Sequence, residues 1–174
     1  MADLQLRRRE LLVLMAAAGI AVGSAAGAAS PQGLNTDAHG VMLRGYDPVA
    51  YFTEGAPVEG SAAFTAEHDG AAYRFASAAN RERFLADPVR YVPAYGGYCA
   101  LGTAMGRKFD GDPQLWRIVE DRLFLNVNAG AQERWLSDTS GFIASADNNW
   151  PLINELADAD LTASPPAGLI VGAN

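Results

Sequence analysis

The chain has 174 residues, a formal net charge of −7 at pH 7, and 49% hydrophobic residues. This length accommodates one domain with its own hydrophobic core, and the composition excludes an intrinsically disordered chain. The acidic balance argues against a nucleic-acid partner, which would require a basic surface. The single cysteine, Cys99, excludes an internal disulfide and any four-thiolate metal site.

Residues 1–28 have the composition of an export signal. Three arginines, Arg7-Arg8-Arg9, precede an apolar stretch at residues 11–22 that is shorter than a membrane span, and Ala26-Gly27-Ala28 provides a small-residue cleavage site. The paired arginines resemble a twin-arginine signal, and an ordinary secretory signal is the alternative. We therefore expect recognition by the export machinery, a periplasmic location, and a mature form without a stable membrane span.

The first half of the expected domain contains a strong hairpin pattern. Residues 29–40 read as a linker, and the folded unit is expected at residues 41–156. Within it, the apolar run at residues 49–52 predicts a strand. Asp69-Gly70 tolerates the positive φ angles of a type I′ turn and predicts a hairpin with strands at residues 63–68 and 71–75. Ser77 then predicts the N-cap of a helix that ends before Pro88.

The second half continues with short elements. A short helix is expected within residues 97–105, and a second hairpin has predicted strands at residues 116–119 and 123–127. Helices are expected at residues 129–136 and 142–146, with Trp150-Pro151 as a break or restart, and residues 157–174 read as an irregular tail. No internal repeat is evident. The predicted fold class is α+β, a small antiparallel sheet of two hairpins with short helices packed on it.

Several of these segments carry motifs that resemble the YHS domain family. Asp47-Pro48-Val49 resembles the opening of that domain, with Ala50 at the position of its first cysteine. The resemblance continues with a hairpin in which Ala76 takes a second cysteine position, and with a helix and its exit; these later matches are Gly70, Tyr73, Phe75, Ser77, Phe84, Asp87-Pro88 and Tyr91.

The longer pattern is similar to an exported bacterial branch of this family, which often carries twin-arginine signals. The matching blocks span residues 41–151, and they are found at residues 45–52, 95–100, 116–118 and 149–151. The resemblance implies a small binding module, and metal binding is implied by the cysteine-bearing relatives.

The candidate metal ligands are Cys99, His68 and Asp47, a mixed sulfur, nitrogen and oxygen set suited to copper or zinc. The simpler interpretation is that Cys99 is a buried small hydrophobic residue and His68 a surface or turn residue.

Five tyrosines are the candidate lining of a ligand pocket, because flat rings with hydroxyl tips suit small molecules. They are Tyr46, Tyr51, Tyr73, Tyr95 and Tyr98, and the alternative is an aromatic core. We expect the pocket where the Asp47 loop, the hairpin and the bend at residues 95–100 meet.

The favoured hypothesis is an exported, non-enzymatic module that binds a metal ion or a small molecule. One alternative is a thiol-dependent redox component or enzyme, with Cys99 as nucleophile and His68 as base. Another is a structural or partner-binding domain without a ligand.

Overall fold

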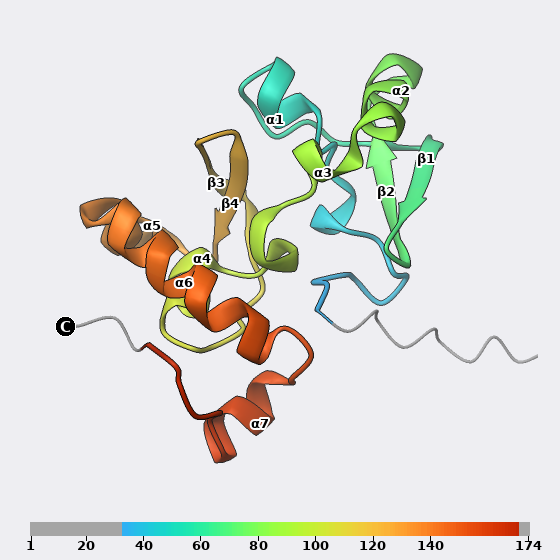
Figure 1. The fold of residues 1–174 in the computed structure, drawn as a ribbon. Helices are drawn as coiled ribbons and strands as arrows, with labels where there is room; N and C mark the ends of the chain where they lie inside the picture. Colours follow the sequence, from blue (N-terminus) through green and yellow to red (C-terminus); the bar gives the residue numbers. More distant parts are fainter. Residues whose placement is uncertain (1–32, 171–174) are drawn as a thin grey trace, which may run out of the picture.

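A computed structural model describes residues 33–170, so the predicted signal peptide and the first linker residues lie outside the described part. The predicted α+β class is confirmed: two antiparallel hairpins form two separate two-stranded sheets, surrounded by short helices (Figure 1). Between residues 33 and 170, no helix combines the length and the apolar character needed to cross a membrane.

The first half of the described chain contains the first hairpin and the helices around it. The two strands meet at Asp69 and Gly70, whose φ angles of 50° and 81° belong to the predicted type I′ turn. The Ser77 side chain accepts a hydrogen bond from Asn80 N and caps the following helix, as predicted. The elements are η1 (Leu43–Gly45), α1 (Ala50–Thr53), β1 (Ser61–His68), β2 (Ala71–Phe75), α2 (Ala78–Ala86) and α3 (Pro88–Tyr91).

The second half contains the second predicted hairpin. Its turn residues Glu120 and Asp121 have φ angles of 49° and 56°, and Asn128 caps the next helix by accepting from Ala131 N. The elements are η2 (Ala94–Gly97), α4 (Ala100–Ala104), β3 (Asp112–Val119), β4 (Arg122–Asn126), α5 (Ala129–Ser137), α6 (Thr139–Ile153) and α7 (Asp158–Ala163).

The two halves are structural repeats, which the sequence analysis missed. β1 begins at Ser61 and β3 begins at Asp112, 51 residues later, and the same offset relates β2 to β4 and α2 to α5. η1 and α1 recur as η2 and α4 at offsets of 50 to 52 residues. Each hairpin also has a register irregularity at the same place in its longer strand. We refer to these halves, residues 43–91 and 94–142, as the first and second repeats.

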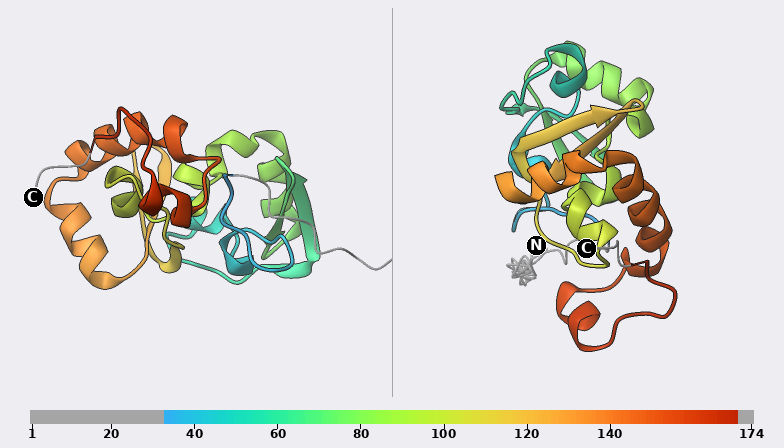
Figure 2. Two further views of the ribbon diagram at one scale, coloured as in Figure 1. Left: turned by 90° about the horizontal axis from the view of Figure 1, so that it is seen from below. Right: turned by 90° about the vertical axis from the view of Figure 1, so that its left-hand side faces the viewer.

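Strand β4 joins the two repeats into one core. Side chains alternate across a strand, so Leu123 and Leu125 point into the cluster of the first repeat while Phe124 points into the cluster of the second. All three side chains are buried. Figure 2 shows the β3–β4 hairpin between the elements of the first repeat and helices α5 and α6. β4 is therefore buried on both faces, with one core cluster on each side.

Three local predictions were wrong. The apolar run at residues 49–52 is largely helical, because the Asp47 carboxylate accepts hydrogen bonds from Val49 N and Ala50 N and starts the turn of α1. Helix α6 runs through Pro151 and ends at Ile153 instead of breaking at Trp150-Pro151. The tail is partly helical, because α7 is held to the domain by Asp158, whose carboxylate pairs with Arg107.

The end of the expected linker is also part of the folded domain. Leu34 packs against the first core cluster, and Asn35 N donates to Gly96 O at 2.8 Å. Gly96 has a φ of 58°, and a Cβ atom there would lie 1.9 Å from Gly33 O. Only glycine therefore lets the N-terminal segment lie across this bend.

Candidate functional site

Asp47, a predicted metal ligand, is fully buried and used as a structural anchor. Its Oδ1 accepts from Val49 N and Ala50 N at 2.8 and 3.3 Å. Its Oδ2 accepts from Ala76 N and from the Asn80 side chain at 2.8 and 2.7 Å. These four contacts join the start of α1 to the segment between β2 and α2, so the carboxylate is occupied by backbone and amide donors.

Cys99 occupies the equivalent position in the second repeat. Its thiol accepts from Gly102 N at 3.4 Å, at the start of α4, and lies 3.6 Å from Asn126 Oδ1. Burial raises the pKa of the thiol, opposed by the backbone N–H groups of Gly102, Val127 and Leu101. Val127 follows Ala76 by 51 residues, so Cys99 and Asp47 receive the same two kinds of backbone donor.

His68 lies at the end of β1, beside the first hairpin turn. Its Nε2 is 3.4 Å from the Asp69 carboxylate, and its ring meets Phe84 edge-on at 5.9 Å between centroids. The three predicted metal ligands thus have separate sets of partners. Across residues 33–170, no three His, Cys, Asp or Glu side chains are grouped so that they could hold a metal ion. The predicted set therefore does not fit a copper or zinc site.

The five candidate tyrosines are divided between core and pocket. Tyr51 is buried in the first cluster and donates to Pro113 O at 3.0 Å, while Tyr46 packs against that cluster. The Tyr98 hydroxyl lies 3.5 Å from Leu34 O, and the Lys108 ammonium lies over the Tyr98 ring, 4.5 Å from its centroid. Only Tyr73 and Tyr95 of the five line the pocket described next.

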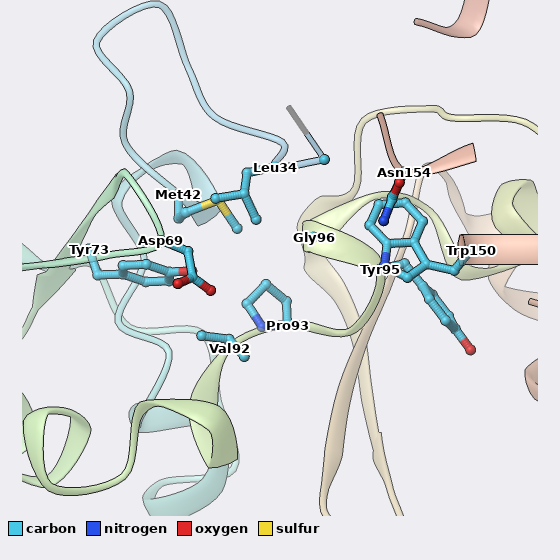
Figure 3. Close-up of a pocket in the computed structure, with 11 residues that line it drawn as sticks. Leu34, Met42, Asp69, Tyr73, Val92, Pro93, Tyr95, Gly96, Trp150 and Asn154 are labelled. Carbon is cyan, nitrogen blue, oxygen red and sulfur yellow. The ribbon is translucent and has the colours of Figure 1, made fainter. Parts of the chain in front are cut away.

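This pocket, the junction pocket, lies where the two repeats are connected and has a volume of about 320 Å³. Figure 3 shows Tyr73 and Asp69 at one end and Trp150 and Asn154 at the other, with Pro93 and Val92 along one side between them. The complete lining is Gly33, Leu34, Met42, Asp69, Tyr73, Val92, Pro93, Tyr95, Gly96, Trp150 and Asn154. The hairpin and the bend at residues 95–100 contribute to this lining, as expected, whereas the Asp47 loop and Cys99 do not.

The wall at the Trp150 end is fixed by buried polar contacts. Lys108 Nζ donates to Asn154 O at 2.8 Å and to Leu156 O at 2.9 Å, and it lies 5.8 Å from the centroid of the Trp150 ring. Burial lowers the pKa of this lysine. Because the ammonium holds the C-terminal end of α6, the Trp150 side chain keeps a defined place in the pocket wall.

Tyr95 is held by a second set of contacts. Its hydroxyl donates to Asp147 at 2.9 Å, and Arg122 forms two hydrogen bonds to the same carboxylate at 2.7 and 3.0 Å. Burial, reinforced by the bond to Asp147, raises the pKa of Tyr95 well above its ordinary value. The phenol is therefore neutral at physiological pH, and it acts as a positioned wall of the pocket.

Sequence reasoning missed most of the pocket lining. Met42, Val92, Pro93 and Asn154 carry no chemical motif, and Leu34 was placed in the linker. Trp150 was expected only as part of a helix break or restart, although it lies in one of the blocks that resemble the exported YHS branch. That block and the bend at residues 95–100 were the sequence features that could have indicated the location of the pocket.

Comparison of the chain with protein-family models, with curated proteins and with solved structures finds no match.

Proposed function

We propose that this chain is an exported, YHS-like binding module that holds a small organic molecule in the junction pocket. The observation that carries the proposal is the pocket itself: a hollow with positioned aromatic walls between two repeats that are packed together through β4. Its volume lies at the lower end of the range for small-molecule sites, which favours a compact ligand such as a single-ring compound.

The lining has the composition expected of such a site. Leu34, Met42, Val92 and Pro93 supply apolar contact, and the ring of Trp150 supplies a flat face. Few polar side chains accompany these residues. The orientation of the ligand would therefore depend on Asp69 and Asn154, which lie at the two ends of the pocket (Figure 3).

Organic-ligand binding is favoured over the metal and thiol alternatives. The Asp47 carboxylate already accepts four hydrogen bonds, and binding a metal there would leave those donors unpaired. A nucleophilic cysteine needs a lowered pKa, whereas burial raises the pKa of Cys99. The remaining hypothesis, a partner-binding domain without a small ligand, gives no role to the preformed pocket.

The test uses methionine methyl groups as reporters. Met42 lines the pocket, whereas Met105 packs against the second core cluster and serves as an internal control. The protein is labelled with ¹³C at the methionine methyl groups and titrated with a set of single-ring compounds. We expect at least one compound to shift the Met42 signal in a saturable way while the Met105 signal stays in place.

A matched pair of variants checks the location. Val92→Trp fills the pocket and should abolish the shift of Met42, whereas Val89→Trp adds the same side chain at a position that is 76% exposed and should leave binding unchanged. If no compound moves the Met42 signal, or if binding survives in the filled variant, the proposed function is wrong.

A further inference from the structure

The charge distribution of the junction pocket defines the class of its ligand. Of the 11 lining residues, all within residues 33–170, Asp69 is the only one that carries a formal charge near neutral pH. A single carboxylate at the end of an otherwise uncharged pocket attracts a cation and repels an anion.

The position of Asp69 is fixed by the hairpin turn. Its φ of 50° places it in the left-handed region that the type I′ turn requires, and His68 Nε2 contacts one carboxylate oxygen at 3.4 Å. The side chain is 76% exposed, so it lies at the mouth of the pocket rather than in its interior. A ligand could therefore place its charged group at the rim and its apolar part inside.

The aromatic walls favour the same ligand class. Tyr73 lies beside Asp69 in Figure 3, and burial together with this carboxylate raises the pKa of Tyr73, which keeps the phenol neutral. Tyrosine and tryptophan faces attract organic cations. With the cation at the Asp69 end of the pocket, the ring of Tyr73 is the aromatic face beside it.

The basic side chains that contact the pocket walls do not reverse this preference. Lys108 is committed to the carbonyl oxygens of Asn154 and Leu156. Arg122 lies over the Tyr95 ring and is paired with Asp147 through two hydrogen bonds.

We propose, on the basis of the function proposed above, that the junction pocket binds a compact organic cation. Its ammonium group lies at Asp69, and its apolar body lies between Met42 and Trp150.

Three single-ring compounds of similar size test the charge preference: 2-phenylethylamine, 2-phenylethanol and phenylacetate. Dissociation constants are measured from the Met42 methyl signal and by calorimetry. We expect the amine to bind about three- to tenfold more tightly than the alcohol, as for a partly exposed ion pair with a cation–π contact. The anion should bind most weakly. Added salt should reduce the advantage of the amine, because the carboxylate is exposed.

Asp69→Asn removes the charge and keeps a residue that tolerates the positive φ angle of the turn. It should weaken amine binding about two- to fivefold and leave alcohol binding unchanged. The control is Glu120→Gln, at the equivalent position of the second hairpin, where φ is 49°. This variant should keep the preference of the unmodified chain for the amine.

The outcomes separate the two proposals. Equal affinity for amine and alcohol, or a preference for the amine that is undiminished in Asp69→Asn, overturns the cation inference while the binding function stands. If none of the three compounds, nor any other single-ring compound, shifts the Met42 signal, the proposed function itself fails. Should Asp69→Asn not fold, the salt dependence of amine binding to the unmodified chain decides the question. A salt-independent affinity then overturns the inference.

Discussion

Replacing Asp47 by asparagine should destabilise the domain strongly, although the two side chains have nearly the same shape. Each carboxylate oxygen accepts two N–H groups in a site that is fully buried. An amide has only one oxygen, so two donors would face its NH₂ group instead of an acceptor. Losing hydrogen bonds to a charged group and leaving buried donors unpaired costs about 3 kcal/mol here, since one of the four contacts is long.

The assay is urea unfolding followed by tryptophan fluorescence. For a domain of this size, about 3 kcal/mol corresponds to a melting temperature roughly 10 °C lower. The slope of the unfolding free energy against urea should not change, because the variant and the unmodified chain expose the same additional surface on unfolding. Asp110→Asn, at an exposed position, is the control and should change stability by less than about 0.5 kcal/mol. A loss below about 1 kcal/mol for Asp47→Asn would refute the anchoring role.

Three further predictions follow from the second repeat and the tail. Ellman's reagent should modify Cys99 at pH 8 only as fast as the domain opens, because burial raises the thiol pKa; rapid labelling of the native protein would support the thiol-enzyme alternative. The hydrogen bond to Arg107 lowers the pKa of Asp158. Its contribution to stability is therefore complete above the ordinary aspartate value of about 3.9, and it disappears as pH falls through the lowered folded value. Unfolding free energies measured from pH 6 to pH 2 should fall less steeply in Asp158→Asn, and identical profiles would contradict this. Trp135→Phe should cost only about 1 kcal/mol in urea unfolding, because it removes a buried indole N–H that has no partner among the described residues; Phe84, its counterpart, fills the same place in the first repeat. A loss of about 3 kcal/mol or more in unfolding free energy, as for replacing a buried tryptophan by alanine, would show that phenylalanine does not fit this position.

Local chemistry made the hairpins and helix starts predictable from the sequence. Asp69-Gly70 supplies positive φ angles without tertiary help, and Ser77 and Asn128 cap helices with their own side chains. The helical turn of α1 was not predictable in this way. Its apolar residues have strand character, and the outcome depends on where the Asp47 carboxylate points.

The internal repeat is not recognisable in the sequence, because equivalent positions have the same backbone geometry but different residue types. Asp47 corresponds to Cys99, and Phe84 corresponds to Trp135. The positive φ angle of Leu43, 54°, recurs at Tyr95 as 53°, although the two side chains differ. Backbone conformation of this kind leaves no mark in a list of residue types.

The junction pocket was unpredictable for a related reason. Its walls come from four segments far apart in the chain, at residues 33–42, 69–73, 92–96 and 150–154. Only the packing of the second repeat onto the first, through β4, brings these segments together. Sequence motifs indicated two of the walls, Tyr73 and Tyr95, and could not indicate how they would be oriented.

The arrangement of the two repeats also supports the proposed binding site at this place. The two repeats are fused through β4, whose side chains fill both core clusters. The connection between the repeats, at Val92 and Pro93, is outside both repeats, and the pocket lies there. A molecule in the pocket contacts both repeats and the N-terminal segment at once. Such a site exists only when the two repeats are packed together, so the proposed ligand would stabilise the whole folded domain rather than either half.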